Sequence, residues 1–104
     1  MENKNLEDLI NLIKQRPALY IGQNSISVLR GFLDGWFFGK EELSDNSILQ
    51  QFEKWVQKHY KMDDRRTWDR IILCFSQDEA NALNNFFLLF EKFLIEFYKN
   101  EKRE

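Results

Sequence analysis

Apolar side chains recur at helical spacing from the beginning of the chain. They predict a first helix over residues 4–16, with its apolar positions at Leu6, Ile10, Leu12 and Ile13. Pro17 ends this helix, because its ring disfavours the α conformation at the preceding residue and removes a backbone donor. The next stretch, PALYIGQN, is expected to form an ordered loop whose apolar members pack beneath the following helix: Leu19, Tyr20 and Ile21.

A second helix is expected from a cap at Asn24 or Ser25 to about Lys40. Its apolar face is broad and comprises Ile26, Leu29, Phe32, Leu33, Trp36 and Phe37. Glycines repeat every fourth residue in the same segment, at Gly31, Gly35 and Gly39. Each interior glycine costs about 1 kcal/mol relative to alanine. The repeat therefore predicts that another helix of the same domain crosses here at close range, with Gly35 facing it.

Three further helices follow. One covers about 46–61, and a short one begins near Thr67. The segment IILCF within the short helix has strand propensity, but the spacing of Trp68, Ile71, Ile72 and Phe75 favours a helix. The last helix runs from about Gln77 to Asn100 and begins with a Ser76–Glu79 capping box. The prediction is an all-α fold, a compact bundle of about five helices with a long Phe-rich C-terminal helix.

Composition places this bundle in a single domain spanning residues 1–104. The chain has 104 residues, of which 43% are hydrophobic and ten are phenylalanine, enough for one core. The net charge of −2 argues against a general nucleic-acid binder, which needs a basic excess. No apolar stretch approaches the roughly 20 residues that span a bilayer. The polar, acidic start of the chain is unlike a secretory signal. We therefore expect no membrane or nucleic-acid partner and a cytoplasmic location.

The sequence offers no pattern typical of catalysis. His59 is the only histidine and Cys74 the only cysteine, and both are expected to be core or boundary residues. Adjacent carboxylates such as Asp78 and Glu79 diverge by about 100° on a helix, so they do not converge as an acid–base pair would. We therefore expect no enzyme activity, no bound metal and no cofactor.

Charge is distributed unevenly over the middle of the chain. Residues 23–53 are net acidic, with Asp34, Glu41, Glu42, Asp45 and Glu53 against Arg30 and Lys40. Residues 54–73 are net basic, with three lysines and three arginines against Asp63, Asp64 and Asp69. Each stretch is either a solvated helix surface or a contact for a partner of opposite charge.

The segment RPALYIG and the following SISVLRGFLDGW resemble a family of small bacterial immunity proteins, which are encoded beside contact-dependent inhibition and other polymorphic toxins. The matching positions are Arg16, Pro17, Tyr20, Ile21, Gly22, Ser25, Ile26, Leu29, Phe32, Gly35 and Trp36. Together with the first predicted helix, which the family also has, the overlap covers about a third of the chain, and it matches a fold signature more than a binding site. The resemblance implies a protein that binds a cognate toxin domain, often a nuclease, and blocks it in the cytoplasm. No toxin-binding residue carries over.

Two surfaces are candidates for the toxin contact. Secreted nucleases tend to be basic, so the favoured surface is acidic: Asp34, Glu41, Glu42 and Asp45, with Trp36 as an aromatic anchor if it is exposed. Trp36 also fits the core face of its helix. The alternative interface is the turn containing Asp63, Asp64, Arg65, Arg66, Trp68 and Asp69. The alternative function is a regulatory or adaptor module without a toxin. A homodimer through the last helix is one form of it, since Leu88 and Ile95 lie outside the main apolar stripe there.

Overall fold

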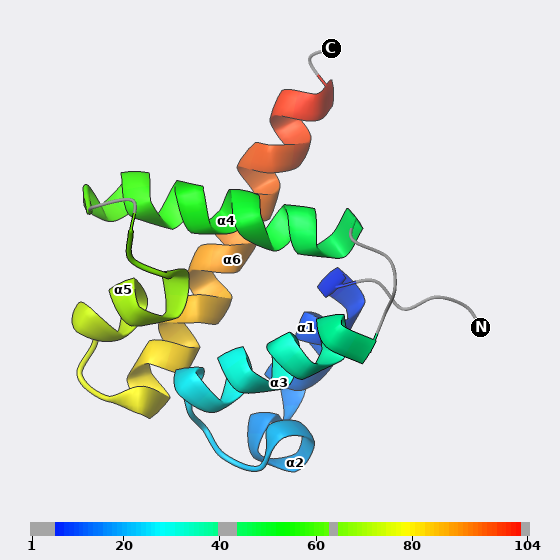
Figure 1. The fold of residues 1–104 in the computed structure, drawn as a ribbon, viewed down its shortest axis with the longest axis vertical. Helices are drawn as coiled ribbons and strands as arrows, with labels where there is room; N and C mark the ends of the chain where they lie inside the picture. Colours follow the sequence, from blue (N-terminus) through cyan, green and yellow to red (C-terminus); the bar gives the residue numbers. More distant parts are fainter. Residues whose placement is uncertain (1–5, 40–43, 63–64, 103–104) are drawn as a thin grey trace.

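The computed structural model describes residues 6–39, 44–62 and 65–102. These residues form six helices and no strand, so the predicted all-α fold is confirmed. In Figure 1, α6 (Glu79–Lys102) runs diagonally through the molecule. Helix α4 (Ser44–Tyr60) crosses in front of α6, and the C-terminal end of α6 extends beyond it. Helix α3 (Ile26–Gly39) begins beside the N-terminal end of α6 and runs away from it toward the right of the view.

The N-terminal part contains a helix that the sequence did not predict. Helix α1 (Leu6–Gln15) ends as expected before Pro17, and Arg16 leaves the helical conformation, with φ −149° and ψ 76°. Pro17 then opens the single turn of α2 (Pro17–Ile21), because a proline at the first helical position loses no hydrogen bond. Gly22 ends that turn with φ 92°, a left-handed conformation that glycine adopts readily. The expected loop is therefore largely helical.

The second predicted helix agrees closely with α3. The Oγ atom of Ser25 accepts a hydrogen bond of 3.1 Å from the Val28 backbone N–H, so Ser25 is the N-cap. Ile26, Leu29 and Leu33 of α3 are fully buried. Helix α5 (Trp68–Cys74) confirms the helical interpretation of the IILCF segment, since its spacing buries Trp68, Ile71 and Ile72 on one side.

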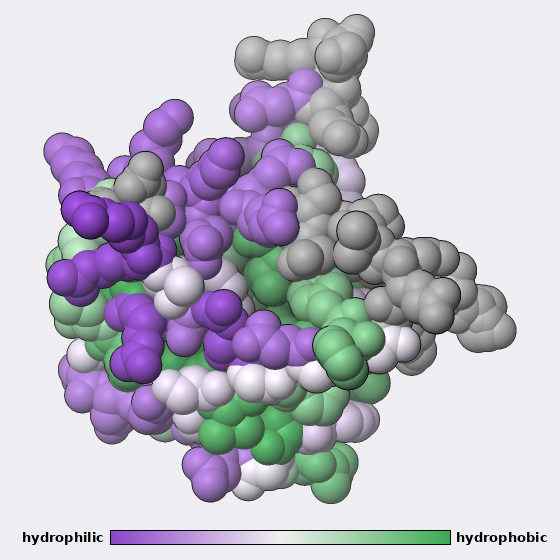
Figure 2. All heavy atoms as spheres, viewed as in Figure 1, coloured by the Kyte–Doolittle hydropathy of each residue, from purple (hydrophilic) through white to green (hydrophobic). Residues whose placement is uncertain are grey.

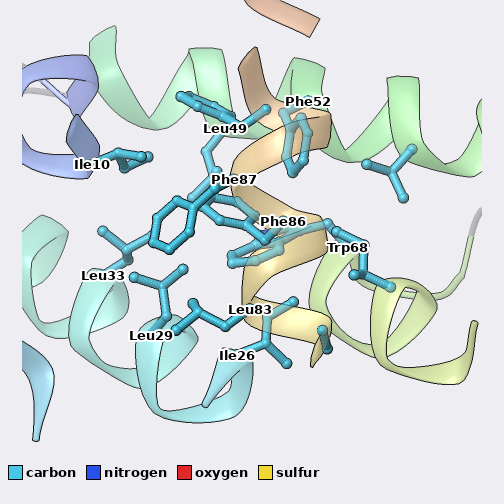
Figure 3. Packing of buried hydrophobic residues seen from close by; sticks show 14 of the residues in the cluster. Ile10, Ile26, Leu29, Leu33, Leu49, Phe52, Trp68, Leu83, Phe86 and Phe87 are labelled. Atoms are coloured by element: carbon cyan, nitrogen blue, oxygen red, sulfur yellow. The ribbon is translucent and has the colours of Figure 1, made fainter. Parts of the chain in front are cut away.

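The core is dominated by aromatic rings. Phe52 of α4 lies at its centre, with ring centroids 5.6 Å from Phe86, 5.2 Å from Phe90 and 5.9 Å from Trp68. Most of these contacts are edge-to-face, the geometry that aromatic pairs prefer. Figure 3 shows Phe86 and Phe87 pointing from α6 toward Leu29 and Leu33 of α3. The phenylalanines of α6 thus connect it with α4 and α5 as well as with α3.

Helix α6 begins differently from the predicted capping box. Asp78, not Ser76, caps it, since Oδ1 of Asp78 accepts a bond of 2.8 Å from the Asn81 backbone N–H. The Ser76 hydroxyl instead donates to the Ile72 carbonyl at 2.6 Å. Glu79 points away from its own helix and binds Ser25 and Ser27 at the beginning of α3. None of the helices in the described part carries an apolar stretch long enough to cross a bilayer.

Candidate protein-binding face on α2 and α3

The outer side of α3 carries small and apolar residues that the fold does not use. Its apolar positions turn Ile26, Leu29 and Leu33 inward, so the helical period directs Gly31, Gly35 and Gly39 toward solvent. A Cβ atom added to any of these three glycines would meet no atom within 4 Å. The prediction that another helix of the domain packs against Gly35 is therefore wrong. Intramolecular packing gives no reason for the stripe.

Large apolar side chains lie exposed on the same helix and on its neighbour. Phe38 is 92% exposed, more than any other large hydrophobic residue in the described part of the chain. On α2, Leu19 is 65% exposed and Tyr20 is 40% exposed, although the sequence suggested that both would be packed. The single turn of α2 can direct only one of its sides toward the core, and Ile21 lies on that side. We refer to Leu19, Tyr20, Gly31, Asp34, Gly35 and Phe38 as the α2–α3 face.

Figure 2 shows how this face is arranged. A pale band runs along α3, with hydrophobic atoms on the side toward α2 and hydrophilic atoms on the side toward α4. The hydrophilic side includes Arg30 and the exposed carboxylate of Asp34, which are joined by an ion pair of 3.2 Å. An apolar area bordered by charge is typical of a protein-contact surface.

The charged border leads into a cleft between α3, α4 and α5. The cleft has a volume of about 200 Å³ and is lined by Arg30, Asp34, Phe37, Leu49, Gln50, Glu53 and Trp68. Glu53 accepts a 2.9 Å bond from the Trp68 backbone N–H, at the first turn of α5. Carboxylates outnumber the single cation among the lining residues, so the cleft favours a cationic group on an incoming partner.

Arg30 connects α3 with α5 at one side of this cleft. Its Nη1 atom donates to Oδ1 of the buried Asp69 at 2.5 Å, and its guanidinium lies 5.8 Å from the centroid of the Trp68 ring. Burial alone would lower the pKa of Arg30. The negative charges of Asp69 and Asp34 outweigh that effect, so the pKa lies above its usual value. Arg30 therefore stays cationic and pairs carboxylates from two helices.

The favoured acidic surface is only partly placed by the structure. Asp34 is exposed on the α2–α3 face, whereas Trp36 is half-buried, packs against the core and meets Phe37 edge-on at 5.2 Å. Glu41 and Glu42 lie outside the described residues, and so does the side chain of Asp45. Phe38, which the sequence analysis did not single out, is the exposed aromatic side chain of this helix. The helical period does indicate it, since Phe38 falls opposite Leu29 and Leu33.

In the alternative interface, the one aromatic residue is buried and cannot contact a partner. Trp68 is 2% exposed because the first turn of α5 inserts its ring next to Phe86, at 5.0 Å between centroids. Asp69 is also buried, in its pair with Arg30. Arg65 and Arg66 are exposed, and Asp63 and Asp64 lie outside the described residues. The four described members of this interface therefore do not form one exposed surface, since Trp68 and Asp69 are buried.

His59 and Cys74 are both exposed, so the expectation that they belong to the core or its boundary is wrong. His59 stacks on Trp55 with 5.1 Å between ring centroids, which places it on the outer side of α4. Within residues 6–39, 44–62 and 65–102, no three side chains of the metal-binding types lie close enough to hold a metal ion.

Comparison of the chain with protein-family models, with curated proteins and with solved structures gave no match.

Proposed function

We propose that this chain is an immunity protein that binds a cognate bacterial toxin domain, a nuclease in the favoured case, and inhibits it stoichiometrically in the cytoplasm without catalysis. The observation that carries the proposal is the exposure of Phe38 beside Asp34 and the glycine stripe of α3. Exposed apolar residues that gather into one area are typical of an interface, and the grouping of Phe38 with Leu19 and Tyr20 once a partner is bound is part of the proposal. The segment that resembles the immunity family also covers α2 and most of α3.

The chemistry of the α2–α3 face suits a basic partner. Phe38, Leu19 and Tyr20 supply apolar area, and interface energy generally concentrates in such buried aromatic anchors. Asp34 and the neighbouring cleft supply negative charge, which accelerates encounter with a cationic protein. The glycines allow a partner backbone to approach α3 closely, because no side chain holds it away. Glu41, Glu42 and Asp45 remain part of the proposed contact.

Co-expression tests the proposal. Cells producing the toxin encoded beside this chain should survive when the chain is present and die when it is absent. Reversing the charges of Glu41, Glu42 and Asp45 together should slow binding and weaken protection while circular dichroism stays unchanged. Equal death with and without the chain would reject the immunity function. Full protection by the triple variant would reject the contribution of the acidic residues.

A second candidate is a regulatory or adaptor module that forms a homodimer through α6. Leu88 and Ile95 support it, since they lie seven residues apart on one side of α6 and are 63% and 65% exposed. Sedimentation velocity over a wide concentration range distinguishes the two candidates. A dimer that Leu88→Lys and Ile95→Lys convert to a monomer would favour the module. A monomer at every concentration would remove the support for this alternative.

A further inference from the structure

A second groove lies between α4 and the C-terminal half of α6. It has a volume of about 380 Å³ and is lined by Gln51, Lys54, Trp55, Lys58, Phe93, Glu96, Phe97 and Asn100. A neighbouring hollow of about 370 Å³ shares Trp55, Lys58, Glu96 and Asn100 and adds His59. Figure 1 shows why the space exists, since α6 crosses behind α4 and then continues beyond it. The groove shares no residue with the α2–α3 face.

The floor of the groove is aromatic and held in place. Trp55 stacks on Phe52 at 6.2 Å and on His59 at 5.1 Å, and it meets Phe93 at 6.0 Å. Its indole N–H donates a 2.9 Å hydrogen bond to Oε1 of Glu96 on α6. These contacts fix the ring on both sides and at its polar edge. An apolar side chain entering the groove therefore meets a preformed surface, which lowers the entropic cost of binding.

The rim of the groove on α4 is cationic. Lys54 and Lys58 lie four residues apart, so both project from the same side of the helix and flank Trp55. Both are exposed, and neither forms an ion pair with a carboxylate in the part of the chain that the structure describes. Glu96, the one acidic residue of the groove, is engaged by the Trp55 indole. Glu96 keeps its negative charge in that bond, but the two lysines outnumber it, so the lining of the groove is net positive.

We propose that this groove binds an acidic amphipathic helix of a partner protein. An apolar side chain of that helix lies against Phe93, Phe97 and the part of the Trp55 ring that Phe52, His59 and Glu96 leave uncovered. Its flanking carboxylates pair with Lys54 and Lys58. The volume matches one or two large side chains of the kind that anchor a helix in a groove. A nucleic-acid strand fits less well, because the two lysines of the groove are too few to neutralise the series of phosphates that a strand presents. The proposal is independent of toxin binding.

The test uses the isotope-labelled protein and three probes followed by two-dimensional NMR. The first probe is a synthetic helical peptide with leucines at helical spacing flanked by glutamates, the second has lysines in place of the glutamates, and the third is a single-stranded oligothymidylate. The indole N–H signal of Trp55, identified by its loss in Trp55→Phe, reports on the groove. The acidic peptide should shift that signal and the amide signals of Lys54 and Lys58. The lysine peptide should not.

A matched pair of variants tests the charge. Lys54→Gln with Lys58→Gln should weaken binding of the acidic peptide at least about tenfold, equivalent to about 1.4 kcal/mol. Lys14→Gln with Arg16→Gln removes two positive charges from residues that do not line the groove, at the cost of an exposed ion pair between Lys14 and Glu91, and should change the affinity less than about twofold. The proposal fails if the acidic peptide does not bind at about 1 mM, where even weak complexes are populated. It also fails if both variant pairs bind alike, or if oligothymidylate shifts Trp55 more strongly than the peptide.

Discussion

Arg30 of α3 reaches across to α5 and bonds Asp69 at 2.5 Å, with only 10% of the Asp69 side chain exposed. The same guanidinium bonds Asp34, whose side chain is 61% exposed. One cation thus forms a buried pair and a surface pair, and the two pairs should differ greatly in their effect on stability.

Asp69→Asn should lower the free energy of unfolding by about 1–3 kcal/mol, because it leaves Arg30 partly buried without its main counter-charge. Asp34→Asn should lower it by less than about 1 kcal/mol, since a surface pair is screened by solvent. Urea unfolding of both variants, monitored by circular dichroism, gives the comparison. Equal losses in the two variants would show that Asp69 does not hold α3 against α5.

Glu79 should make stability depend on pH. The backbone N–H of Ser27 donates to its carboxylate at 3.0 Å, and the hydroxyls of Ser25 and Ser27 donate at 2.8 Å. These bonds, that from the Ser27 backbone first, lower the pKa of Glu79 below its usual value. The unfolded chain therefore takes up the proton at a higher pH than the folded one, so the stabilisation is complete at neutral pH and is lost as pH falls through the folded pKa.

Glu79→Gln should accordingly cost about 1 kcal/mol at pH 7, with the loss shrinking as the pH is lowered below about 4.5. Urea unfolding of the wild type and the variant between pH 7 and pH 3 measures the difference. Asp78→Asn is a suitable control, since asparagine also caps helices well. A difference that is the same at every pH would mean that the charge of Glu79 plays no part.

Substitutions of Gly35 should preserve or raise the stability of the fold, whereas a large side chain at this position should weaken toxin binding. A Cβ at this position meets nothing within 4 Å, so Gly35→Ala should raise the free energy of unfolding by about 0.5–1 kcal/mol. Gly35→Leu should fold normally and yet bind the toxin more weakly, because its side chain keeps a partner away from α3. Thermal unfolding combined with calorimetric titration against the toxin tests both effects. Unchanged binding by Gly35→Leu would place the contact elsewhere.

Most of the fold was predictable from the sequence, because helical periodicity depends on local positions. The spacing of Trp68, Ile71 and Ile72 was enough to favour a helix over a strand for α5. The direction of the glycine stripe was also available from the period, since Gly31 and Gly35 fall opposite Leu29 and Leu33. The prediction that another helix packs against Gly35 relied on the four-residue spacing of the glycines. It did not consider that they lie on the side of the helix opposite the core residues.

Long-range polar contacts were not predictable in the same way. Glu79 matched a local capping box, but its partners Ser25 and Ser27 precede it by more than fifty residues, and only the packing of α3 on α6 brings them together. The α2 turn was missed because five residues are too short for a periodic signal. For the candidate site, the sequence indicated Asp34, and the helical period also directs Phe38 away from the core, but its 92% exposure is known only from the packing of the other helices.

The central claim is that the α2–α3 face binds the toxin, and calorimetric titration of Phe38→Ser against the cognate toxin domain tests it most directly. Phe38 is 92% exposed, so the variant should unfold within about 0.5 kcal/mol of the wild type. Its affinity should fall at least about tenfold, as expected for the loss of an aromatic anchor. Leu88→Ser, which removes an exposed apolar side chain from α6, should change the affinity less than about twofold. Wild-type affinity for Phe38→Ser, or a larger loss for Leu88→Ser, would contradict the claim.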